Sequence, residues 1–187
     1  DLADQAQIFA TVNLEQTKVN KSLVYDLYEL AHSRSPQKTC HNIAVTLDGD
    51  PESPFYQRIK RLGLATEGRI FEPIAQATFV EALMGYISDN PKADRDKLLR
   101  GGKLTRASAE DVNRLPLRNM FAEERDIEIA MVVNNYFSAV KKRWPEAWDE
   151  RGQGFVLNRT NGFRALMKLF RTAYLNVGVP GDVPAAD

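Results

Sequence analysis

A short polar turn near the start of the chain brings four kinds of hydrogen-bonding group together. Amide, carboxylate, hydroxyl and ammonium side chains follow one another between Asn13 and Lys18. The candidate ligand-binding residues of this turn are Asn13, Gln16, Thr17 and Lys18. The ammonium group of Lys18 would supply the charge for binding a phosphate or polarising a ligand. The alternative is a helix-to-helix connector whose polar groups cap one another, and spacing alone favours the connector.

A second candidate site opens the last apolar segment of the chain. Thr160, Asn161 and Gly162 stand at the predicted start of a helix, with Arg159 and Arg164 on either side. Unpaired N–H groups and the helix dipole favour an anion at such a position, which would make this a phosphate site. Thr160 acting only as the N-cap of the helix explains the same residues and is the more common case.

A third candidate is a strip of basic residues in the polar region that follows Pro91. Its members are Lys97, Arg100, Lys103 and Arg106, which Arg114, Arg118 and Arg125 could extend. Contact with a DNA backbone requires clustered Lys and Arg side chains rather than a high net charge. The alternative, which the sequence favours, is a charged surface loop whose cations are balanced by nearby acids.

The remaining reactive side chains indicate no metal site and no identifiable catalytic residue. His32 and His41 are nine residues apart, whereas metal sites are usually built from ligand pairs at closer or repeated spacing. Cys40 has no activating partner beside it in the sequence. The carboxylates from Glu123 to Glu128 are explained by their position at a helix start, where they complement the dipole.

Apolar periodicity predicts a mainly α fold, a helical bundle with at most a short strand pair. The helices are expected near residues 21–33, 38–47, 78–87, 120–143 and 160–176, after a first helix that buries Ile8, Phe9 and Val12. A strand is expected within 68–74, and a long mobile surface segment over 91–116. Gly178 is expected to end the last helix as a left-handed cap. The division is a single helical domain over 1–178 and a tail over 179–187.

Composition limits the classes of protein to which the chain can belong. The 187 residues are enough for one domain with a sizeable core, and 25 basic residues balance 25 acidic ones. No apolar run approaches the roughly 20 residues that a membrane helix needs, so no membrane partner is expected. A single cysteine permits no internal disulfide, which favours a reducing, cytoplasmic location.

Two stretches of the sequence resemble a known family. The first is Phe-Ala-Thr-Val-Asn-x-x-Gln-Thr-Lys-Val-x-x-Ser-Leu-Val-x-Asp-Leu, carried by Phe9, Asn13, Gln16, Thr17, Ser22 and Leu23. The second is Leu157-Asn158-Arg159-Thr160-Asn161-Gly162-Phe163-Arg164-Ala165-Leu166, which is similar to the family's Thr-x-Gly-x-x-Ala-Leu helix start. Both resemble segments of DGQHR-domain proteins, a family that includes the DndB-type proteins of bacterial DNA phosphorothioation, or sulfur-modification, clusters.

The family's signature, Asp-Gly-Gln-His-Arg, is absent from this chain. The only Asp-Gly pair is Asp48-Gly49, which Asp50 follows. In the family the signature precedes the Phe-x-x-x-Asn segment, so the resemblance implies the C-terminal part of a ParB/sulfiredoxin-like α/β domain in a longer protein. It also implies that any nucleotide binds in the full-length protein, with no cofactor in this fragment.

Three functions remain open from the sequence. The first is a regulatory or DNA-binding protein associated with DNA modification or defence, a restriction-modification-like role in which other proteins of the system are partners. The second is the accessory half of an enzyme that hydrolyses a nucleotide or nicks DNA, and the third is a helical protein-interaction domain. Surface exposed by truncation would favour self-association. The resemblance further predicts that the opening polar turn and the start of the last helix meet to form one pocket wall.

Overall fold

The computed structural model describes residues 2–14, 20–152 and 154–186, without the side chains of residues 12–14. Within these ranges the protein is mainly helical, with one sheet of two very short parallel strands. This confirms the predicted fold class.

The elements follow one another along the chain with mostly short connections. They are α1 (Leu2–Leu14), α2 (Lys21–Leu27), the 3-10 turn η1 (Tyr28–Leu30), α3 (Pro36–Gly49), β1 (Ile59–Lys60), β2 (Ile74–Ala75), α4 (Gln76–Met84), α5 (Pro91–Leu99), α6 (Arg118–Ala122), α7 (Asp126–Arg143), α8 (Pro145–Asp149) and α9 (Thr160–Val177).

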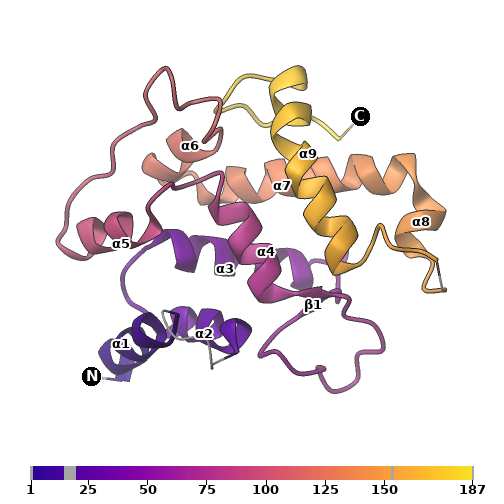
Figure 1. The fold of residues 1–187 in the computed structure, drawn as a ribbon, viewed down its shortest axis with the longest axis horizontal. Coiled ribbons are helices and arrows are strands. Elements are labelled where there is room, and N and C mark those ends of the chain that lie inside the picture. Colours follow the sequence, from indigo (N-terminus) through magenta and orange to yellow (C-terminus); the bar gives the residue numbers. More distant parts are fainter. Residues whose placement is uncertain (1, 15–19, 153, 187) are drawn as a thin grey trace.

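Two helices cross in front of two others in the centre of the molecule. Figure 1 shows α4 and α9 in front of α3 and α7, with α1 and α2 at one end and α8 at the other. The helices meet over a cluster of buried rings, in which Phe55 packs edge-on against Phe137 at a centroid distance of 4.7 Å and Phe137 stacks on Phe163 at 5.4 Å. The Trp148 indole N–H donates to the carbonyl oxygen of Pro54, so the ring is buried without leaving its polar atom unpaired.

Several helix starts are capped by side chains. The side chains of Asn20, Ser35 and Asn90 accept hydrogen bonds from backbone N–H groups at the starts of α2, α3 and α5. Pro36 and Pro91 occupy the first turns of α3 and α5, where their missing N–H groups cost nothing.

The segment 91–116 is not the long mobile segment that its polar composition suggests. It begins with α5, which ends at Leu99, and the chain beyond is fixed by contacts with α6. The Asn119 side chain accepts from the Ala107 N–H, and the Arg118 guanidinium donates to the carbonyl oxygen of Thr105. Long-range polar contacts therefore order a segment that has few apolar residues of its own.

The predicted helix over 120–143 is two helices. α6 ends at Ala122 and α7 begins at Asp126, and between them Glu124 adopts a left-handed conformation with φ of 61°. The apolar stripe continues across this break, since Met120 and Phe121 of α6 and Ile129 and Val133 of α7 are all buried. For that reason the break is invisible in the periodicity.

Three smaller expectations are also wrong. A strand is expected within 68–74, but only Ile74 of that range lies in one. The observed strand β2 is Ile74–Ala75 and pairs in parallel with β1. Gly178 has an extended backbone with φ of −161°, so it is not a left-handed cap. On α1, Ile8 and Phe9 are 64% and 52% exposed, because α1 lies at the edge of the fold and packs through small residues, Ala6 and Ala10.

No helix in the described ranges is both long enough and apolar enough to cross a bilayer.

Candidate nucleic-acid interface

All four predicted basic residues at and after the end of α5 are exposed, and three of them lack a carboxylate partner within the described part of the chain. Lys97, Arg100 and Lys103 are exposed, and none forms an ion pair with a carboxylate in the ranges that the structure describes. Gly101, with φ of 73°, and Gly102 turn the chain sharply here, and their N–H groups donate to the carbonyl oxygens of Leu98 and Lys97. This tight turn holds the three cations around one helix end.

Arg106 and the three arginines that could extend the strip are paired with carboxylates, although Arg106 and Arg114 remain exposed. Each of them forms an ion pair: Arg106 with Glu123 at 3.2 Å, Arg114 with Asp111 at 2.8 Å, Arg118 with Asp94, and Arg125 with Glu128. Arg118 is buried rather than displayed. In the predicted basic strip, Lys97, Arg100 and Lys103 are therefore exposed without an ion pair among the described residues, and Arg106 is exposed with one.

A second set of cations lies on α9. Arg164, Lys168 and Arg171 are exposed and are spaced by four and three residues, which places them on one side of the helix. The opposite side is buried through Phe163, Met167 and other large apolar residues. We call Arg164, Lys168 and Arg171 the α9 stripe.

The α9 stripe has no acidic counterpart on its own helix. α9 contains no Asp or Glu, whereas α1, α3, α4, α5 and α7 each contain at least one. Among the described residues neither Lys168 nor Arg171 forms an ion pair, and Arg164 makes only a long contact of 3.4 Å with the Thr78 hydroxyl. At a rise of about 1.5 Å per residue the stripe extends for about 10 Å, the length of about three base-pair steps.

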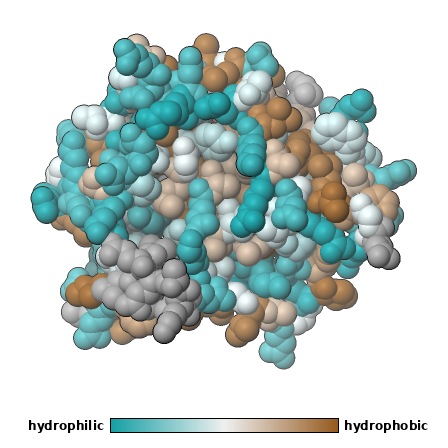
Figure 2. Space-filling model, in the orientation of Figure 1, coloured by the Kyte–Doolittle hydropathy of each residue, from teal (hydrophilic) through white to brown (hydrophobic). Residues whose placement is uncertain are grey.

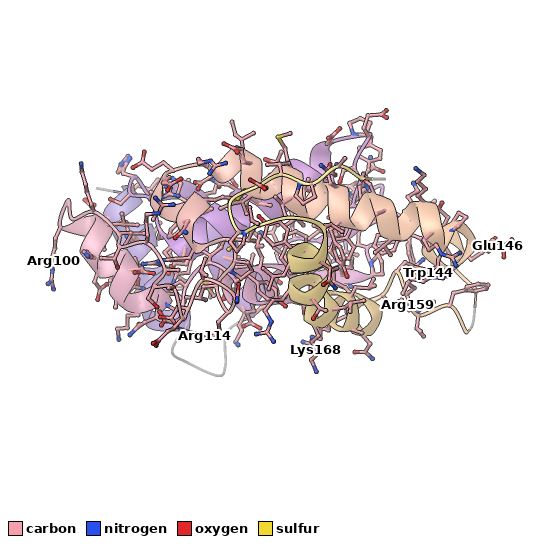
Figure 3. The ribbon with its side chains drawn as sticks, turned by 90° about the horizontal axis from the view of Figure 1, so that it is seen from above. Arg100, Arg114, Trp144, Glu146, Arg159 and Lys168 are labelled. Atoms are coloured by element: carbon pink, nitrogen blue, oxygen red, sulfur yellow. The ribbon has the colours of Figure 1, made fainter. Side chains whose placement is uncertain are left out.

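The labelled members of the two sets of cations lie in different parts of the molecule. In Figure 3, α9 and α7 are on opposite sides; Lys168, Arg114 and Arg159 lie on the α9 side, and Arg100 lies at the α5 end. Figure 2, which views the molecule from the α9 side, shows hydrophilic side chains across much of this face.

At the start of α9, the predicted anion site, Thr160 is not the N-cap residue that its position suggests. Arg159 is the N-cap residue and provides no side-chain cap, while the Thr160 hydroxyl donates to the Pro73 carbonyl oxygen at 2.8 Å. A Cβ atom at Gly162 would lie 2.2 Å from the carbonyl oxygen of Val156, so glycine is required for close packing. Thr160 and Gly162 thus tie α9 to neighbouring segments.

A hollow of about 320 Å³ lies beside this helix start. Arg159, Thr160 and Asn161 line it together with the segment from Ile70 to Pro73, and Arg164 is not among its lining residues. The guanidinium groups of Arg151 and Arg159 lie 5.3 Å and 6.0 Å from the centroid of the Phe71 ring. Part of the positive charge here is therefore directed at an aromatic face.

The first candidate site falls largely outside the described residues. Gln16, Thr17 and Lys18 are not among them, and neither is the side chain of Asn13. The backbone of α1 contacts α2 and η1, whereas α9 contacts α4 and β2. Figure 1 shows α1 at one end of the molecule, with the start of α9 on the far side of α4. The described elements therefore do not bring together α1 and the start of α9, the two parts of the chain that were expected to border one pocket wall.

The buried Cys40 and His41 are held as neutral side chains. Burial raises the pKa of the Cys40 thiol, and burial lowers the pKa of His41 despite the nearby carboxylates of Asp26 and Glu29. The Gln76 side-chain amide donates to Nδ1 of His41 at 2.7 Å. The described residues contain no group of three or more His, Cys, Asp or Glu side chains placed to bind a metal ion.

Comparison of the chain with protein-family models, curated proteins and solved structures finds no match.

The α9 stripe is not among the sites that the sequence patterns predict. Those patterns assign Arg164 only to the helix start and give no role to Lys168 or Arg171. The signal was present, because residues 160–177 contain three cations at helical spacing and no acid. Such a pattern is visible in a sequence once charge is plotted on the same helical wheel as hydrophobicity.

Proposed function

We propose that this protein binds DNA through the sugar-phosphate backbone, using cations on its α9 side. The observation that carries the proposal is the α9 stripe, three exposed cations on a helix without a carboxylate. A cation already paired with a carboxylate must give up that ion pair before it contacts a phosphate, and the described surroundings of Lys168 and Arg171 impose no such loss. Lys97, Arg100 and Lys103 supply further contacts at the α5 end.

A formal net charge of zero does not oppose this proposal. Charges more than about 8 Å apart are largely screened from one another at physiological ionic strength. What a phosphate experiences is therefore the local set of cations and not the balance over the whole chain. The expected mode is contact without base readout, because Lys and Arg side chains on a phosphate backbone position a protein but carry no sequence information directly.

The resemblance to DGQHR-domain proteins supports a biological setting for such binding. On this basis we propose a DNA-modification or defence system of the phosphorothioation type, in which the chain is a regulatory or DNA-binding part and other proteins of the system are its partners. An Asp-Gly-Gln-His-Arg motif some tens of residues before Asp1 in a parent sequence would support this setting. A parent sequence without the motif would count against it.

The proposal is tested with three double variants that change the charge equally. Lys168→Glu/Arg171→Glu alters the α9 stripe, and Arg100→Glu/Lys103→Glu alters the α5 end. The control is Lys141→Glu/Lys142→Glu, which alters exposed residues of α7, the helix that lies opposite α9 in Figure 3. Binding to a short fluorescein-labelled DNA duplex is measured by fluorescence anisotropy at low salt.

The α9 double variant should weaken binding by about tenfold or more, because two phosphate contacts become repulsions. The α5 variant should weaken binding by a smaller factor, and the control should bind as the unmodified protein does. If the control loses as much affinity as the α9 variant, binding follows overall charge and the proposed surface is wrong. Far-UV circular dichroism of each variant verifies that the helices are retained.

A further inference from the structure

The imidazole of His41 on α3 is fully buried and faces two carboxylates. Its Nδ1 atom lies 3.9 Å from Oδ1 of Asp26 on α2, and its Nε2 atom lies 3.9 Å from Oε2 of Glu29 on η1. Both distances are longer than a hydrogen bond, so the ring lies near two acids without being bonded to either. The Asp26 side chain is only 7% exposed, whereas that of Glu29 is 59% exposed. Glu29 is therefore the carboxylate with room to move toward the ring.

Arg61 already donates to the same two oxygen atoms. Its Nε lies 3.2 Å from Oδ1 of Asp26, and its Nη2 lies 3.1 Å from Oε2 of Glu29. The next residue, Leu62, has a left-handed backbone with φ of 52°, and its N–H donates to Oδ2 of Asp26 at 2.7 Å. These contacts attach the start of the segment 61–73, which joins β1 to β2, to α2 and η1. Figure 1 shows this connection as a wide loop beside β1.

One polar atom of the buried ring has no partner. The Gln76 side-chain amide donates to Nδ1 of His41 at 2.7 Å, so the neutral ring carries its proton on Nε2. That Nε2 is buried and forms no hydrogen bond within the described parts of the chain. Buried donors are nearly always paired, and the nearest acceptor for this one is the Glu29 oxygen that Arg61 holds.

A second proton on His41 would change this competition. The proton goes to Nδ1, and the Gln76 amide turns over so that its oxygen accepts from the new N–H. The Nε2–H then belongs to a cation, which attracts the Glu29 carboxylate more strongly than the neutral ring does. The imidazolium and the Arg61 guanidinium now face the same oxygen atoms with like charges, which disfavours their sharing Glu29.

We propose that His41 is a pH-sensitive switch for the attachment of the segment 61–73. On protonation, Glu29 leaves Arg61 and pairs with the imidazolium, and the start of the segment is released from η1. The residues of the switch belong neither to the α9 stripe nor to the α5 end, so the switch does not depend on DNA binding.

The charges around His41 decide the pH range of the switch. Among the described residues, Asp26 and Glu29 favour the protonated ring, Arg61 and Lys38 oppose it, and α4 contributes an uncharged amide. Burial is the largest influence and lowers the pKa of His41 below its usual value of 6.5. The released state should therefore become populated as the pH falls below 6.5.

The proposal is tested by hydrogen–deuterium exchange on the full chain, followed by mass spectrometry of its peptic peptides. Exchange is measured between about pH 7.5 and about pH 5, and each rate is corrected for the intrinsic effect of pH. His41→Asn removes the titrating group. His32→Asn is the matched control, because it makes the same change at the other histidine of the chain, which is exposed. Arg61→Gln removes the attachment without altering the buried ring.

In the unmodified protein and in His32→Asn, corrected exchange within 61–73 should rise at least about threefold as the pH falls, while that of α9 stays constant. His41→Asn should abolish this rise, and Arg61→Gln should exchange rapidly in this segment at both ends of the pH range. The proposal is overturned if the rise is missing, persists in His41→Asn, or occurs equally in α9, which would indicate general destabilisation. Slow exchange of the segment in Arg61→Gln near neutral pH would also overturn it, because Arg61 would then not be the attachment.

Discussion

The buried ion pair between Arg118 and Asp94 positions the α5 end of the proposed interface. Their side chains are only 8% and 14% exposed, and the guanidinium also donates to the carbonyl oxygens of Thr105 and Ile87. Replacing Arg118 by methionine retains most of the volume but leaves the Asp94 carboxylate with the Ser88 hydroxyl as its remaining described partner. Removing one partner of a buried pair costs about 3–5 kcal/mol, because the other charge stays buried without compensation.

The expected effect on thermal stability follows from the size of the protein. A chain of 187 residues loses about 2–4 °C in Tm for each kcal/mol, so Arg118→Met should lower Tm by roughly 6–20 °C. The double variant Arg118→Met/Asp94→Leu should recover much of this loss, because it leaves no unpaired buried charge. Arg114→Met, which breaks an exposed ion pair, should leave the unfolding midpoint unchanged.

The assays are thermal and urea unfolding followed by circular dichroism at 222 nm on the unmodified protein, Arg118→Met, Asp94→Leu, the double variant and Arg114→Met. The coupling free energy from this cycle should be favourable and larger than about 1 kcal/mol. Single-variant losses that simply add in the double variant would refute the reasoning. So would an Arg118→Met variant with the same midpoint as Arg114→Met.

Two further predictions concern a packing contact and a buried histidine. Gly162→Ala should destabilise the fold by about 1–3 kcal/mol, since its Cβ would lie 2.2 Å from the Val156 carbonyl oxygen; an unchanged urea midpoint would show that the close approach is absent. Because burial lowers the pKa of His41 below its usual value of 6.5, the folded protein binds fewer protons there than the unfolded chain does. The free energy of unfolding should therefore be steady above about pH 7 and fall as the pH drops below 6.5. His41→Asn should flatten this pH dependence. Equal slopes of unfolding free energy against pH for the variant and the unmodified protein would contradict the prediction.

The sequence predicted the elements that apolar periodicity governs. The last helix is the clearest case, because Phe163, Leu166 and Phe170 recur at helical spacing and all three are buried. What it could not predict depends on contacts between distant residues. α5 has few apolar residues, and its place is fixed by Arg118, which lies 24 positions from Asp94 in the chain. Within a short stretch of sequence, residues 91–99 are only a polar segment.

The candidate sites divide in the same way. A polar helix end is expected to expose its charged side chains, and the structure exposes Lys97, Arg100 and Lys103. Arg118 has the same charge and a similar neighbourhood in the sequence, yet it is buried, because its role is set by a carboxylate on another helix. Likewise, Thr160 is an apparent N-cap by position, but its hydroxyl is used by the Pro73 carbonyl oxygen.

The most direct test of phosphate-backbone binding is the salt dependence of duplex affinity for the unmodified protein. Each phosphate contact made by Lys or Arg contributes about −0.9 to the slope of log K against log salt concentration. Three contacts from the α9 stripe and up to three from the α5 end predict a slope between about −3 and −5. A slope near zero, or no binding to the duplex even at low salt, would contradict the account.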